Sequence, residues 1–145
     1  MEGARFDPLL LENQLCFPLY ACAREVMKKY KPFLDEVDLT YTQYVTMMVL
    51  WEKREVTSKE IGERLHLDSG TLTPVIKKLE EKGFVTRSRC AEDERNLLVT
   101  LTDAGLDLRQ RAEPIPERVG ACVRLTPEDA KALYGLLYRL LGSME

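Results

Sequence analysis

Residues 58–83 read SKEIGERLHLDSGTLTPVIKKLEEKG, and this stretch decides the fold of the chain. Thr57 and Glu60 have the spacing of a capping box, which predicts that a short helix begins here. The residues HLD then turn into a second helix, which Gly83 is well placed to end. The inward-facing stripe of that second helix is formed by Leu72, Val75, Ile76 and Leu79. We therefore expect two helices joined by a tight turn.

Two segments rich in β-branched and apolar residues follow this pair of helices. FVTRSR (84–89) and NLLVTL (96–101) are joined by the charged connector CAEDER (90–95), which predicts a two-stranded hairpin. The full order is helix, helix, short helix, turn, helix, hairpin, helix, helix. This order predicts a mainly α (α+β) fold, a winged helix-turn-helix flanked by N- and C-terminal helices.

Two helices are predicted before the helix pair. The first is expected from Leu9 to Tyr30, with Pro18 interrupting its interior and Pro32 ending it. Thr40 then opens a core helix with a capping box.

Further along, Thr102 caps a helix that Pro114 and Pro116 should end, and Thr126 caps the last helix with Pro127 at its first position. The apolar residues of ALYGLLYRLL (132–141) surround that last helix, so a homodimer interface is expected to cover them.

Composition places the chain among globular proteins. It has 145 residues, about one domain, with 45% hydrophobic and 31% charged residues. No apolar run approaches the roughly 18 residues of a membrane span, so no membrane partner is expected. The N-terminus MEGARFDPLLLENQ carries acids and a proline where a signal peptide needs a basic start and an apolar core. The expected location is cytoplasmic.

The charge balance restricts how nucleic acid could be bound. The net charge is −3, and residues 57–101 hold eight basic and eight acidic side chains. Because counterion release depends on the phosphates that are actually neutralised, a DNA partner requires cations sorted onto one face.

Four cysteines, Cys16, Cys22, Cys90 and Cys122, are spaced too irregularly for a zinc site, and His66 is the only histidine. We expect no metal and no cofactor. In a reducing compartment these residues are thiols, so any disulfide among them would be a signalling event.

Cys16 lies on one line of the first predicted helix together with Tyr20, Ala23, Met27 and Tyr30, whereas Cys22 points elsewhere. A phenol hydroxyl can donate a hydrogen bond to a thiolate and so favour the reactive, ionised form. Free cysteine is also one of the residue types most often buried, so a stripe of Cys, Tyr and Met can simply be part of the core. Spacing alone therefore leaves two readings of Cys16, core residue or reactive thiol.

The connector and second strand read DERNLLVTLTDAG, which fits the pattern D-x-R-x-x-x-V-x-L-T-x-x-G. This resembles MarR-type winged-helix repressors. Within them, the segments LENQLCFPLYACAREVMKKYKPFLDEVDLTYTQY (11–44) and LDSGTLTPVIKKLE (67–80) resemble the organic hydroperoxide regulators, and the likeness covers nearly the whole chain. It implies one domain over residues 1–145, with dimerisation helices at 9–40 and 107–145 and a winged-helix DNA-binding lobe at 41–106.

For DNA, the resemblance implies a recognition helix in the major groove, a wing in the minor groove, and a pseudo-palindromic double-stranded operator. Hydroxyl groups and lysines suit phosphate contacts, and Arg95, oriented by Asp93, suits the narrow groove. The residues assigned to DNA are Ser69, Thr71, Thr73, Pro74, Lys77, Lys78, Arg87, Asp93 and Arg95.

For sensing, the resemblance implies that Cys16 is oxidised by an organic hydroperoxide and that Tyr30 and Tyr41 hydrogen-bond it, with Tyr20 nearby. Cys122 stands where a resolving thiol would lie, condensing with a Cys16 sulfenic acid of the other subunit. A low-molecular-weight thiol could cap Cys16 instead, and Cys22 and Cys90 have no matching role.

These residues predict a transcriptional repressor, not an enzyme, that leaves DNA when peroxide oxidises Cys16. Three alternatives share some of the features. A MarR-type repressor could be released by a small aromatic ligand, a thiol peroxidase could use the same cysteine catalytically, and a winged helix could bind a protein in place of DNA.

Overall fold

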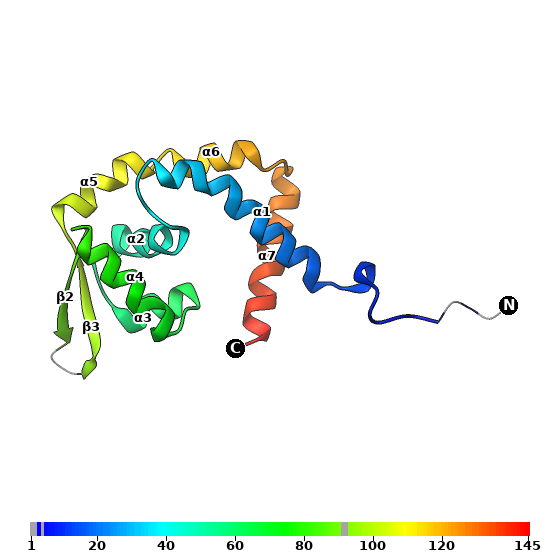
Figure 1. Cartoon of the computed structure of the whole chain (residues 1–145), viewed down its shortest axis with the longest axis horizontal. Helices are drawn as coiled ribbons and strands as arrows, with labels where there is room; N and C mark the ends of the chain where they lie inside the picture. The colour runs from blue at the N-terminus through cyan, green and yellow to red at the C-terminus, as the bar shows by residue number, and fades with distance from the viewer. Residues whose placement is uncertain (1–2, 4, 91–92) are drawn as a thin grey trace.

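The computed structural model describes residue 3, residues 5–90 and residues 93–145, without the side chains of residues 93–95. Helices dominate, and a small sheet projects from one end as a wing (Figure 1). The elements are η1 (Leu11–Asn13), α1 (Cys16–Asp35), α2 (Tyr41–Lys53), β1 (Glu55–Thr57), α3 (Ser58–Leu65), α4 (Ser69–Glu81), β2 (Val85–Cys90), β3 (Asp93–Leu101), α5 (Asp103–Ala112), α6 (Ile115–Cys122) and α7 (Pro127–Ser143).

The predicted pair of helices is confirmed as α3 and α4. The Thr57 hydroxyl accepts a hydrogen bond from the Glu60 amide at 3.2 Å and caps α3. Gly83 has a φ of 84°, and the amides of Gly83 and Phe84 bond back to the carbonyls of Glu80 and Leu79. This reciprocal pattern ends α4 where the glycine predicted it. Leu72, Ile76 and Leu79 are buried, and Val75 is half-buried.

The predicted hairpin is also confirmed, but the sheet has a third strand that the sequence reading missed. The strand order is β1-β3-β2, antiparallel throughout. β1 has only three residues, and its Val56 pairs with Val99; both side chains are buried. This pairing fixes the base of the wing against the start of α3.

The predicted limits of the first helix were wrong at both ends. α1 begins at Cys16, so Pro18 lies in the first turn, where its missing N–H would have no helical partner in any case. α1 also continues through Pro32 to Asp35, because packing of the following turn outweighs the lost hydrogen bond: Leu34 is buried, and Arg118 lies 4.2 Å from the Phe33 ring.

The prolines at 114 and 116 do not leave a long break. α5 ends at Ala112 and α6 begins at Ile115, with Pro114 as its N-cap residue and Pro116 in its first turn. Both prolines occupy positions that need no helical N–H. Buried Ile115 and Val119 help α6 pack against α1.

The buried core lies mainly between α2, α3, α4, α5 and the sheet, whereas α7 has no buried residue. Large apolar side chains remain uncovered on the N-terminal segment, on the start of α1 and along α7. They are Phe6, Leu9, Leu10, Leu11, Leu15, Phe17, Leu19, Leu125, Leu133, Leu136, Leu140 and Met144. Figure 1 shows the N-terminal segment running away from the rest of the chain. Across the described residues, no helix combines the length and apolar character that crossing a bilayer requires.

Candidate functional site

One face of α4 gathers most of the residues predicted to bind DNA. They lie opposite the buried stripe and are exposed: Ser69, Thr71, Thr73, Pro74, Lys77 and Lys78. Lys78 is 3.3 Å from the Glu81 carboxylate, in an exposed pair of the kind that contributes little to stability. The helix therefore presents small hydroxyl groups and two cations to solvent, a combination that suits close approach to a phosphate backbone.

Asp68 determines where this helix begins. Its carboxylate accepts a 2.7 Å hydrogen bond from the Thr71 amide, and hydrogen bonding from Thr71 lowers the pKa of Asp68. The ionised carboxylate thus caps α4 and complements the positive end of the helix dipole.

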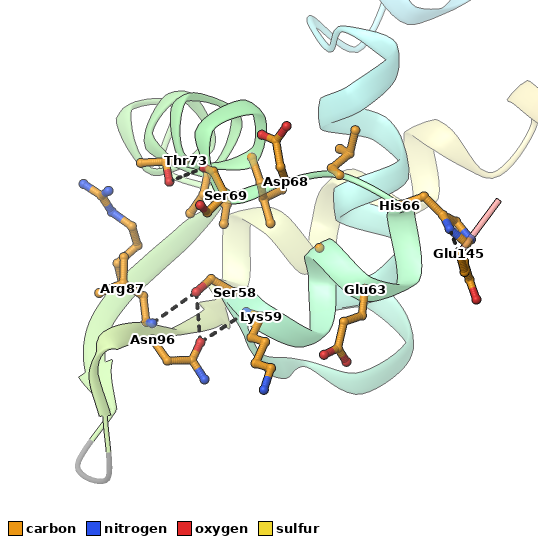
Figure 2. A pocket seen from close by; sticks show the side chains of 15 residues that line it. Ser58, Lys59, Glu63, His66, Asp68, Ser69, Thr73, Arg87, Asn96 and Glu145 are labelled. Carbon is orange, nitrogen blue, oxygen red and sulfur yellow. Dashed lines mark hydrogen bonds and ion pairs between the residues drawn. The ribbon is translucent and has the colours of Figure 1, made fainter. Parts of the chain in front are cut away.

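The base of the wing is tied to the start of α3. Figure 2 shows Ser58, Lys59 and Asn96 meeting there, beside a hollow of about 930 Å³ between α3, α4 and the sheet. The Asn96 side-chain carbonyl accepts from the Ser58 hydroxyl at 3.0 Å and from the Lys59 amide at 3.1 Å. These bonds fix the wing relative to α3.

The remaining predicted DNA contacts differ in their surroundings. The Arg87 guanidinium is held by Glu80, with Nη2 3.0 Å and Nε 3.2 Å from Oε1, and this contact lowers the pKa of Glu80. Arg87 therefore joins β2 to α4 within the chain. Asp93 and Arg95 fall among the side chains outside the described residues.

Three tyrosines form a cluster where α1 meets α2. The ring centroids of Tyr30 and Tyr41 are 5.0 Å apart, and Tyr44 lies 6.0 Å from Tyr30 and 6.2 Å from Tyr41. Burial raises the pKa of each phenol, that of Tyr44 to about 12. Tyr44 was missed by the sequence reading, although its spacing of three residues from Tyr41 places both on one face of α2.

Cys16 does not lie in this cluster. It is the first residue of α1, fourteen residues before Tyr30, which corresponds to about 21 Å at about 1.5 Å per residue. Cys16 is exposed, and Tyr20, one turn further along α1, is 61% exposed. Within one chain, the structure brings Tyr30 and Tyr41 together but leaves the thiol far from them.

Cys122, the predicted resolving residue, ends α6. Its thiol is exposed and donates a 3.5 Å hydrogen bond to the Arg118 carbonyl one turn earlier. In Figure 1 this end of α6 lies apart from the beginning of α1. Cys22 is exposed on α1, and Cys90 is half-buried at the end of β2. The described side chains include no cluster of three or more His, Cys, Asp or Glu that could hold a metal ion.

The Tyr44 hydroxyl is buried without a hydrogen-bond partner among the described residues, which leads to a stability prediction. Tyr44→Phe should leave the free energy of unfolding at pH 7 unchanged or raise it by about 1 kcal/mol, because an unsatisfied buried hydroxyl is removed. The raised pKa means that the folded state resists ionisation, so wild-type stability should be full below pH 10 and fall as the pH rises towards 12.

Urea unfolding at pH 7 and at pH 11 measures both effects. The fall between the two pH values should be smaller for Tyr44→Phe than for wild type. A loss of more than about 1 kcal/mol at pH 7 would mean instead that the hydroxyl is satisfied in solution.

A family model described as transcriptional regulator SarA/Rot matches residues 28–111, more than half of the chain. The chain belongs to this family of transcriptional regulators. It is 47% identical over 140 residues to the organic hydroperoxide resistance transcriptional regulator of Bacillus subtilis, an alignment that covers 97% of this chain and 95% of the relative.

Solved structures agree with this assignment. Reduced AbfR bound to DNA is 36% identical, with a TM-score of 0.75 over 93% of this chain and 94% of that one; AbfR is a protein of Staphylococcus epidermidis. Sco3205, a MarR family regulator from Streptomyces coelicolor in complex with DNA, is 25% identical with a TM-score of 0.83 over 94% of both chains. The predicted fold and the resemblance to MarR-type, organic hydroperoxide regulators are therefore confirmed.

Proposed function

We propose that this chain is a hydroperoxide-sensing transcriptional repressor. In this proposal the reduced homodimer binds operator DNA, and oxidation of Cys16 by an organic hydroperoxide releases it. The observation that carries the proposal is the distance, within one chain, between the exposed Cys16 at the start of α1 and the half-buried pair of Tyr30 on α1 and Tyr41 on α2. A second copy of the chain, packed along α1, would bring a thiol and these phenols together.

The uncovered apolar side chains support the homodimer. They lie on the N-terminal segment, the start of α1 and around α7, and all of them except Phe6 fall within the predicted dimerisation segments 9–40 and 107–145. Burying this surface against its own copy would provide the main favourable free energy of association. The winged-helix lobe at 41–106 would then stay free to contact DNA.

A two-fold axis near the middle of α1 would account for the sensor. Two antiparallel copies of α1 would place each Cys16 beside Tyr30 and Tyr41 of the partner subunit, and the symmetry makes both contacts equivalent. Phenol hydroxyls donating to the thiolate would stabilise its ionised form. Tyr20, one turn from Cys16, would lie in the same interface.

The proposed chemistry has two steps. The Cys16 thiolate attacks the terminal oxygen of the hydroperoxide, the O–O bond breaks, and the alkoxide takes a proton and leaves as alcohol, giving Cys16 sulfenic acid. The thiol of Cys122 from the other subunit then attacks that sulfur; an S–S bond forms, the S–O bond breaks, and water leaves. A cellular thiol would reduce the disulfide and restore the repressor.

The DNA side of the proposal uses the exposed face of α4, with Ser69, Thr71, Thr73, Pro74, Lys77 and Lys78, and the wing with Asp93 and Arg95. Arg87 would act indirectly, through its contact with Glu80. AbfR has been solved bound to DNA in reduced and in overoxidised form, and separately with a disulfide. By similarity, we infer that the disulfide of this chain, and not oxygen on one sulfur alone, releases the operator.

A titration tests the function against its alternatives. A duplex selected by the reduced protein from a random pool is bound, and cumene hydroperoxide is added at one equivalent per subunit. Release should be complete, with about one alcohol formed per Cys16. A repressor that responds to an aromatic ligand would stay bound, a thiol peroxidase would turn over many equivalents, and a protein-binding winged helix would select no duplex.

Cys122→Ser tests the resolving step. Without this thiol, Cys16 should still be oxidised, but the operator complex should survive hydroperoxide at least about tenfold better than that of wild type when no small thiol is present. Gel shift and mass spectrometry of the complex measure both quantities. Release of Cys122→Ser at the wild-type concentration of peroxide would assign resolution to another group.

A further inference from the structure

The turn between α1 and α2, residues 36–40, receives cationic side chains from two distant parts of the chain. Lys82 reaches it from the end of α4, and Arg111 and Arg118 reach it from α5 and α6. The proposed function uses none of these contacts, although they lie between the thiols and α4.

Lys82 joins the turn to α4. It is the C-cap residue of α4, and its ammonium group donates to the Asp38 carbonyl and, at 3.0 Å, to the Gln43 side-chain carbonyl. Its side chain is only 24% exposed, whereas Lys77 and Lys78 on the outer face of α4 are exposed. Asp38 has a φ of 54°, so this carbonyl is directed by a backbone conformation that non-glycine residues seldom adopt.

Arg118 joins the same turn to α6. Its Nη1 and Nη2 lie 2.5 Å and 3.2 Å from the two carboxylate oxygens of Glu36, and its guanidinium stacks 4.2 Å from the Phe33 ring centroid. Arg111 donates to the Glu36 carbonyl. A paired, stacked guanidinium holds its partner in one orientation better than a single contact would. The Arg118 carbonyl accepts from the Cys122 thiol, so this anchor lies one turn from the proposed resolving sulfur.

We propose that Lys82 and Arg118 form an ionic relay through the α1–α2 turn, which couples the thiols to the position of α4. The relay rests on the proposed function, since it needs an oxidation event to transmit. When Cys122 is drawn towards a sulfur of the partner subunit, α6 shifts, Arg118 pulls the turn through Glu36, and Lys82 displaces the end of α4.

The contacts are continuous, which is what the relay requires. The Cys122 thiol donates to the Arg118 carbonyl, and the Arg118 guanidinium pairs with Glu36. In the same turn, the Asp38 carbonyl accepts from Lys82 at the end of α4. α4 carries the face proposed to contact DNA. Both anchors are charge-assisted and act on one short turn, Arg118 on Glu36 and Lys82 on Asp38 two residues later. Lys82 is therefore a positioning residue, acting on DNA binding through α4 and making no contact with the duplex.

Lys82→Met tests the relay, because methionine keeps the length of the side chain and removes the ammonium group. The readout is the coupling ratio, the operator dissociation constant after treatment with cumene hydroperoxide divided by that of the reduced protein. Wild type should give a ratio on the order of 100. Lys82→Met should bind the operator within about threefold of wild type when reduced, oxidise Cys16 at the wild-type rate, and give a ratio below about 10.

Lys31→Met is the matched control. Lys31 pairs with Asp35 at 3.1 Å within α1 and joins α1 to no other element among the described residues, so the coupling ratio of Lys31→Met should remain that of wild type. A wild-type ratio in Lys82→Met would overturn the relay, as would a loss of reduced-state affinity with an unchanged ratio, which is what a direct contact with DNA predicts. If wild-type protein itself is not released by hydroperoxide, the proposed function fails first.

If Lys82→Met does not fold, exchanging the charges of Arg118 and Glu36 tests the relay instead. Arg118→Glu should lower the coupling ratio by about tenfold, and Glu36→Arg in the same chain should restore at least half of the loss on a logarithmic scale. Failure of the double variant to recover any coupling, with both variants folded, would also overturn the relay.

Discussion

Operator complexes of Cys16→Ser should survive organic hydroperoxide at concentrations that release wild-type protein completely. Serine keeps the size and exposure of the side chain but lacks a sulfur that can accept the peroxide oxygen. A shift of about 3 kcal/mol between two states already weakens binding on the order of 100-fold, so the variant should retain about that much more operator affinity after treatment. Reduced-state affinity should not change, because Cys16 lies on α1, away from α4.

Cys22→Ser is the control for this result. Cys22 is an exposed thiol on the same helix, six residues from Cys16 and on another side of α1. The substitution therefore removes one sulfur and leaves the proposed sensor Cys16 unchanged. The variant should be released as wild type is. Electrophoretic mobility shift with cumene hydroperoxide and with hydrogen peroxide measures both variants. If Cys16→Ser is released as readily as wild type, the sensor assignment is wrong and another group of the chain responds to the peroxide.

The sequence predicted those elements whose ends are set by residues close in the chain, and it missed those that depend on contacts between residues far apart in the chain. Local signals were sufficient for α3 and α4, since Thr57, Asp68 and Gly83 determine these ends through bonds to residues three to five positions away. They failed for β1, a strand of three residues that exists only because Val56 meets Val99 more than forty residues later. Pro32 misled for the same reason, since long-range packing of Phe33 and Leu34 keeps α1 helical.

The candidate site shows the same division. The spacing of Cys16, Tyr20 and Tyr30 correctly placed them on one helix, and the exposed face of α4 followed from its apolar stripe. Spacing along a helix shows which side of the helix a residue is on but not how far apart two residues on that side are. Cys16 and Tyr30 share one side of α1, yet some four helical turns separate them. Arg87 looked free to meet DNA because its contact with Glu80 depends on how β2 packs against α4.

Close packing around Gly105 explains why the last position of the D-x-R-x-x-x-V-x-L-T-x-x-G segment is a glycine. A Cβ at this position would lie 2.2 Å from the Phe84 carbonyl oxygen and 2.7 Å from a Leu101 methyl group. The surrounding backbone cannot easily withdraw: the Gly105 amide donates to the Thr102 hydroxyl at 3.0 Å, and its carbonyl accepts from the Trp51 indole at 2.8 Å. α5 is thus fixed against both the wing and α2 at the point of closest approach.

Gly105→Ala should therefore cost more than about 4 kcal/mol of the free energy of unfolding, because the clash is with backbone and the two hydrogen-bonded partners, Thr102 and Trp51, must move together. Circular dichroism during urea unfolding, at one fixed protein concentration, measures the loss without relying on Trp51, whose own contact is disturbed. Gly120→Ala is the control. Gly120 lies within α6, and beyond its own helix backbone no atom of the described residues lies within 4 Å of an added Cβ, so alanine there should stabilise the chain by up to about 1 kcal/mol. Equal effects of the two substitutions would mean that α5 and the wing are not packed as closely as the structure has them.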